Sequence, residues 1–85
     1  MNKKKLLDKI TNSAKNIRFA DFVMLIEAYG FRRTRCDGSH EIYRRKGISD
    51  IVNIQNNKGQ AKPYQVRQFL SLVEKHNLKL EENDV

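Results

Sequence analysis

The chain has 85 residues, of which 39% are hydrophobic and 32% charged, and its formal net charge is +7 at pH 7. This length allows one small domain with a single core, because so short a chain buries only about 60% of the surface that its unfolded form exposes. The single cysteine excludes an internal disulfide, and no hydrophobic run is long enough for a membrane span or a secretory signal, so we expect a cytoplasmic protein.

Positive charge is concentrated in the middle of the chain. Residues 31–67 contain nine Lys and Arg against three Asp and Glu, a net charge of +6, whereas the closing residues 80–85 are acidic. A positive field on the folded part of a protein favours a polyanionic partner. The alternative is a solvated basic face that keeps the protein in solution.

Two helices are predicted before residue 30. Residues 3–11 place leucine and isoleucine on one side and lysines on the other. Residues 20–29 carry a clear hydrophobic stripe, and Gly30 follows at the position where a left-handed residue commonly ends a helix. The stripe consists of Phe19, Phe22, Val23 and Ile26.

The hydrophobic period then changes from that of a helix to that of strands. Residues 31–36, 39–45 and 50–55 are short runs rich in β-branched and aromatic residues, and turn sequences separate them. They predict an antiparallel three-stranded meander. Residues 56–62 are predicted to form a polar loop.

A last helix is predicted to begin at Pro63, because the first turn of a helix does not need the missing N–H, and to end near residue 76. The expected order in this α+β fold is α-α-β-β-β-α. Since so small a sheet must cover one face with helices, its other face is left open to solvent or a ligand. We expect a single domain over residues 1–85, with an N-terminal helix at 3–11, a core at 17–76 and an acidic tail at 80–85.

His40 is the candidate for chemistry. It follows the turn glycine Gly38, lies among arginines, and is of a residue type that titrates near neutral pH. RNA supplies its own nucleophile, the 2′-hydroxyl, so a ribonuclease without a metal needs only a proton-transferring group and cations that stabilise the charge on the phosphate. An exposed histidine in a hairpin without a catalytic role is the alternative.

The predicted strands also supply candidate RNA contacts. Side chains alternate across a strand, so Arg33 and Arg35 are expected on the same side, and a bulge at Gly38 would shift the register of the next strand. Tyr43 is either a platform for an unstacked base or a core aromatic. The candidate RNA-binding residues are Arg33, Arg35, Gly38, Ser39, Tyr43, Arg44, Arg45, Lys58 and Lys62. No metal site is expected.

Three segments occur in a characteristic order: EAYGF at 27–31, GSHEIYR at 38–44 and AKPYQVRQFL at 61–70. In this order and spacing they resemble the HicA-type (YcfA-like) toxins of bacterial type II toxin–antitoxin modules, over roughly residues 17–76. The resemblance implies a fold like that of double-stranded-RNA-binding domains and cleavage of mRNA with relaxed sequence preference. It also implies that the histidine of the Gly-Ser-His motif, here His40, is catalytic.

The resemblance further implies neutralisation by a HicB-type antitoxin that covers the active site, and no cofactor. We expect the free protein to be monomeric. Many members of the family carry Pro-x-His at the end of the third strand, where this chain has Gln55-Asn56-Asn57, so a second histidine is not expected in the site. Two alternatives are a non-catalytic RNA-binding module with the same basic face and an interaction protein that binds an acidic partner.

Overall fold

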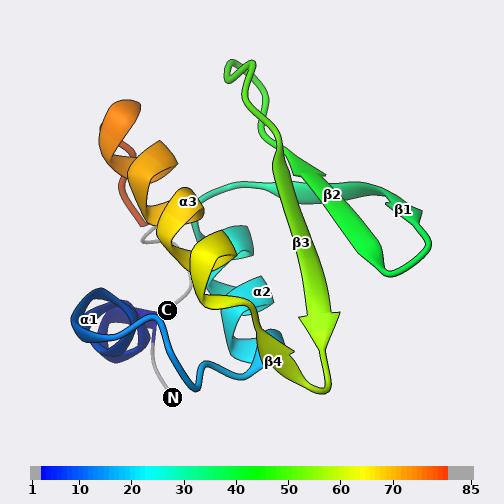
Figure 1. Cartoon of the computed structure of the whole chain (residues 1–85). Coiled ribbons are helices and arrows are strands. Elements are labelled where there is room, and N and C mark those ends of the chain that lie inside the picture. Colours follow the sequence, from blue (N-terminus) through cyan, green and yellow to red (C-terminus); the bar gives the residue numbers. More distant parts are fainter. Residues whose placement is uncertain (1–2, 81–85) are drawn as a thin grey trace.

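The computed structural model describes residues 3–80, and within this range it has an α+β fold of three helices and one four-stranded antiparallel sheet (Figure 1). No helix in this range is long and apolar enough to cross a membrane. Residues 81–85 of the predicted acidic tail lie outside the described part. In chain order the elements are α1 (Lys3–Asn12), α2 (Phe19–Ala28), β1 (Arg32–Asp37), β2 (His40–Arg44), β3 (Val52–Asn57), β4 (Gln60–Ala61) and α3 (Pro63–Lys75).

The helices and the three longer strands confirm the predicted α+β order, whereas the prediction of a three-stranded sheet is wrong. Residues 60–61, predicted as loop, form the short strand β4 and pair with Asn57 and Asn56 of β3. Lys58 and Gly59 between the strands both have positive φ, as in a two-residue type I′ hairpin turn. Two strand residues within a polar sequence carry too little hydrophobic pattern to be recognised.

The core is centred on Phe69 of α3. Its ring contacts those of Phe22, Tyr29 and Phe31 edge to face, with centroids 5.6 to 5.9 Å apart. All four side chains are buried. This geometry places the positive edge of one ring against the negative face of another, so α2, α3 and the start of the sheet are joined in one cluster.

The helix α1 extends this core with one face. Leu6 and Ile10 are buried in the same hydrophobic cluster as the side chains of α2 and α3. These residues are four apart and therefore lie above one another on the same side of the helix. The predicted amphipathic helix at residues 3–11 is thus confirmed.

The register shows which face of the sheet is covered. Tyr43 of β2 lies opposite Val52 of β3, and Glu41 lies opposite Ile54. Directly opposite residues share a face, and Tyr43, Val52 and Ile54 belong to the core cluster. All three helices lie on this side of the sheet, which leaves the other face open, without a helix over it, although Ile42 on that face is buried (Figure 1).

An ion pair stabilises the start of α2. Arg18 Nε and Nη2 donate hydrogen bonds to the carboxylate of Asp21 at 3.1 and 3.2 Å. These hydrogen bonds lower the pKa of Asp21 below its ordinary value. A carboxylate in the first turn of a helix also interacts favourably with the positive end of the helix dipole.

Candidate functional site

The turn Gly38-Ser39 places His40 at the beginning of β2. Gly38 has a φ of +61°, and Asp37 pairs with His40 across the turn. A left-handed residue at only the first central position is typical of a type II′ hairpin turn and favours glycine. A turn before His40 was predicted correctly, and the register at Gly38 is regular.

The irregularity of this hairpin lies in β1 instead, where Thr34 is an extra residue between Arg33 and Arg35. Arg33 lies opposite Tyr43, and Arg35 lies opposite Ile42. Arg33 is therefore on the helix-covered side at an exposed position, and Arg35 is on the open side. The prediction that the two arginines share a side is wrong, because it assumed unbroken alternation.

His40 lies on the open face and is partly exposed. Its Nδ1 is 3.0 Å from Oδ1 of Asn53, which β3 contributes. An amide oxygen can only accept a hydrogen bond, so this contact requires the proton to be on Nδ1. In the neutral ring Nε2 then carries the lone pair and can accept a proton.

Gln55, the residue of β3 opposite His40, connects the turn to α3. Its Nε2 donates to Ser39 Oγ at 2.7 Å, and its Oε1 accepts a hydrogen bond from Lys62 Nζ at 2.6 Å. Its backbone N–H donates to Oε1 of the buried Gln65 at 2.9 Å. One side chain thus places an ammonium group beside the Gly-Ser-His turn.

Several other predicted residues contribute positive charge around this site. Arg35 is exposed and forms an ion pair with Asp37 at 3.2 Å. Arg44 is exposed on the same face as His40, at the other end of β2. Lys58 is exposed in the β3–β4 turn. The open face therefore combines a histidine with arginine and lysine side chains that solvent can reach.

Tyr43 cannot serve as the predicted stacking platform, because only 2% of its surface is exposed. Its hydroxyl donates to Oε1 of Glu41 at 2.9 Å, and burial followed by this hydrogen bond raises its pKa. Of the two roles considered for Tyr43, the structure supports the core aromatic.

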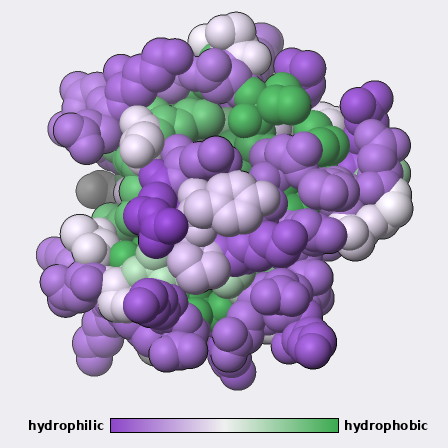
Figure 2. Space-filling model, viewed as in Figure 1, coloured by the Kyte–Doolittle hydropathy of each residue, from purple (hydrophilic) through white to green (hydrophobic). Residues whose placement is uncertain are grey.

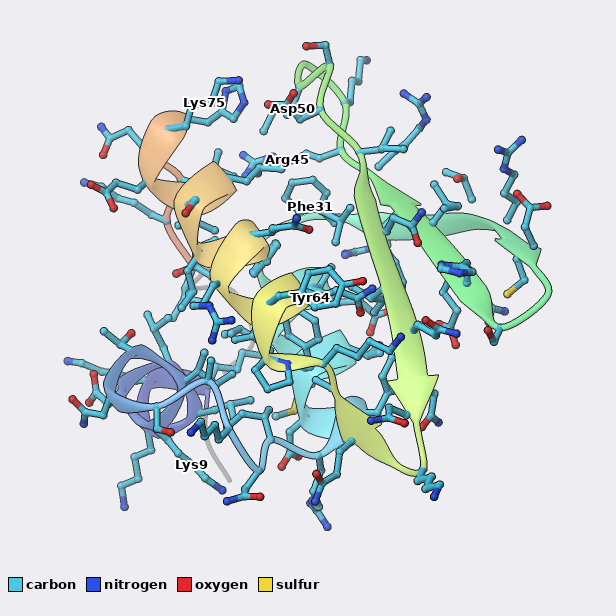
Figure 3. The ribbon with its side chains drawn as sticks, in the orientation of Figure 1. Lys9, Phe31, Arg45, Asp50, Tyr64 and Lys75 are labelled. Atoms are coloured by element: carbon cyan, nitrogen blue, oxygen red, sulfur yellow. The ribbon has the colours of Figure 1, made fainter. Side chains whose placement is uncertain are left out.

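Arg45 makes a structural contact that the sequence did not predict. It is half-buried, and its Nη1 donates to the backbone carbonyl of Tyr29 at 2.8 Å. Figure 3 shows it extending from the sheet toward the helices. Because the last carbonyls of a helix lack partners within the helix, Arg45 supports the end of α2.

Sequence reasoning missed three residues of this region: Asn53, Gln55 and Tyr64. Tyr64 is 48% exposed, and its Oη accepts a hydrogen bond from Nε2 of Gln65 at 3.2 Å. In Figure 3 it lies between α3 and β3. Its position outside the apolar stripe of α3 was a signal of exposure, and the alternation of Asn53 and Gln55 with buried residues of β3 was another.

The surroundings of the site are mostly polar. Figure 2 shows hydrophilic residues over most of the face that carries α3 and β3, with hydrophobic residues visible between them. Asn53 and Gln65 also line an open groove between these two elements. Within residues 3–80, no three His, Cys, Asp or Glu side chains are grouped so that they could hold a metal ion.

Comparison with known proteins gives no family assignment. No family model matches the chain, and neither a curated protein nor a solved structure matches it significantly. The likeness to HicA-type toxins and to double-stranded-RNA-binding domains therefore stays a prediction from the sequence.

Proposed function

We propose that the protein is an endoribonuclease of the HicA toxin type, which cleaves mRNA in the cytoplasm and uses His40 for proton transfer. The observation that carries the proposal is the position of His40 on the open face of a basic sheet. One ring nitrogen contacts Asn53, and arginine and lysine side chains lie on the same face.

In the proposed reaction Nε2 of His40 accepts the proton of an RNA 2′-hydroxyl. The 2′-oxygen attacks the adjacent phosphorus, the bond from phosphorus to the 5′-oxygen breaks, and the leaving oxygen takes up a proton from the imidazolium or from water. The products are a 2′,3′-cyclic phosphate and a 5′-hydroxyl. Arg35, Arg44 and Lys62 stabilise the negative charge that builds on the phosphate oxygens.

The same face binds the RNA substrate in this proposal. Arginines suit phosphates because their planar groups donate two parallel hydrogen bonds, and Lys58 extends the basic surface. Tyr64, in the first turn of α3 and two residues after Lys62, takes the role first considered for Tyr43, since an exposed ring can stack an unpaired base. A HicB-type antitoxin that covers this face would block both binding and cleavage.

The test is incubation of the purified protein with a defined mRNA in EDTA, followed by identification of the product ends. We expect 2′,3′-cyclic phosphate ends from the wild type, and cleavage slowed by about 10²- to 10⁴-fold in His40→Ala, the usual contribution of a general acid or base. His76→Ala is the matched control. His76, at the end of α3, contacts Asp50, so this variant should cleave RNA like the wild type.

Full cleavage by His40→Ala, with its fold verified by circular dichroism, would refute the catalytic role. RNA binding that weakens with salt, combined with no cleavage at any protein concentration, would instead identify a non-catalytic RNA-binding module.

A further inference from the structure

We propose that Asn53 is a positioning residue that holds His40 in the Nδ1–H tautomer, so that Nε2 is the nitrogen facing the substrate. The catalytic consequence of this inference rests on the proposed function. The tautomer itself is a property of the folded protein and can be measured without RNA.

The two side chains are held together by the sheet. Asn53 is two residues from Gln55, the register partner of His40, so it is a diagonal neighbour on the same face. The backbones of β2 and β3 thus fix where both side chains begin. The distance from Nδ1 of His40 to Oδ1 of Asn53 is 3.0 Å. Such a contact restricts the ring's rotation as well as its tautomer.

The oxygen and the nitrogen of the Asn53 amide would impose different tautomers on His40. With Oδ1 toward the ring, as in the structure, Nδ1 must carry the proton and Nε2 is the base. With Nδ2 toward the ring, the amide would donate to Nδ1 and place the proton on Nε2, which could then no longer accept one. The two arrangements predict opposite tautomers.

The charged groups on the same side of the sheet as His40 come from β1, from β2 and from the residue that precedes α3. Asp37 lies opposite it on β1 and is ion-paired with Arg35, and Arg44 shares its face of β2. The ammonium group of Lys62, which directly precedes α3, reaches Gln55. The residue in contact with Nδ1 is a neutral amide, whose oxygen favours the tautomer with the proton on Nδ1.

The direct test is the tautomeric state of His40, read from the long-range nitrogen–proton correlations of its ring by NMR at a pH where the ring is neutral. We expect the Nδ1–H form in the wild type and a shift toward the Nε2–H form in Asn53→Ala. Asn57→Ala is the matched control. Asn57 is also an exposed asparagine of β3, and it is an even number of residues from Asn53. Observation of the Nε2–H tautomer in the wild type, or of an unchanged tautomer in Asn53→Ala, would overturn the inference.

The kinetic test is the pH dependence of RNA cleavage. Asn53→Ala should lower kcat by about 10- to 100-fold through loss of ring orientation, with little change in KM. Asn53→Asp keeps an acceptor for Nδ1–H and adds a negative charge, so the acidic limb of the profile should move upward by about one pH unit or more. A profile of Asn53→Asp that coincides with that of the wild type would contradict the positioning role.

The proposed function and the role of Asn53 can be refuted independently of each other. A wild-type protein that does not cleave RNA would refute the proposed function, while the NMR measurement would still decide whether Asn53 sets the tautomer. An Nε2–H ring in a protein that cleaves RNA through His40 would refute the inference alone.

Discussion

The two faces of the sheet use alternate residues of the same strands but are organised by different interactions. On the covered face, Tyr43, Val52 and Ile54 are buried and pack against the helices. On the open face, His40 and Gln55 are partly exposed, and their side chains are held by hydrogen bonds of 2.6 to 3.0 Å. Packing on the covered face therefore stabilises the fold, and the polar groups on the open face can contact a ligand.

The largest effect is expected from Phe69→Ala on the covered face. This change removes the ring that three other aromatic rings contact, and truncation of a buried phenylalanine costs about 3 to 5 kcal/mol. The free energy of unfolding, measured by urea denaturation, should fall by this amount. His40→Ala should change it by less than about 0.5 kcal/mol, as is usual for surface substitutions. Equal losses in the two variants would abolish the distinction between the faces.

The next effect concerns RNA binding and should come from Tyr64→Ala. Stacking of one base on an aromatic side chain contributes about 1 to 3 kcal/mol, so the Kd for single-stranded RNA should rise by about 5- to 150-fold. Stability should be almost unchanged because the ring is exposed. Fluorescence anisotropy with a labelled oligonucleotide measures the affinity. Binding that is unaffected in this variant would remove Tyr64 from the proposed interface.

A smaller effect is expected from Tyr43→Phe, which keeps the buried ring and removes only the hydrogen bond to Glu41. The loss of one such bond should lower the free energy of unfolding by about 1 kcal/mol. RNA affinity should equal that of the wild type, since this side chain is on the covered face. A loss of affinity comparable to that of Tyr64→Ala would reverse the assignment of the two tyrosines.

The elements of the covered face could largely be predicted from the sequence. Hydrophobic residues at helical spacing mark α2 and α3, and Gly30, with a φ of +89°, ends α2 as expected. The two-residue turn at Gly38 also fixes the position of His40 on β2. These features depend on local patterns, which a single sequence contains.

The arrangement of the open face could not be predicted in the same way. The contact between His40 and Asn53 depends on the register of β2 and β3, and the long connection over residues 45–51 leaves that register undetermined by turn geometry. The extra residue Thr34 has no signal among the polar residues of β1. Residue type alone also did not distinguish Arg45, which supports α2, from the exposed Arg44.

The smallest effect on stability is expected from an ion pair that belongs to neither face of the sheet and includes the second histidine, His76. His76 Nε2 and Lys75 Nζ lie 2.7 and 3.2 Å from Oδ2 of Asp50, near the end of α3, and Figure 3 shows Asp50 and Lys75 side by side. The hydrogen bond with His76, followed by that with Lys75, lowers the pKa of Asp50 from its ordinary value of 3.8.

Because the carboxylate form of Asp50 is favoured in the folded state, its contribution to stability is present above about pH 4 and is lost as the pH falls through the lowered pKa. Asp50→Asn should therefore slightly lower the melting temperature at pH 7 and make no difference in strong acid, since exposed ion pairs contribute little. Thermal melts of both proteins between pH 2 and 7 test this. RNA cleavage by Asp50→Asn should match that of the wild type, because a histidine that pairs with a carboxylate away from the open face has no place in the proposed reaction.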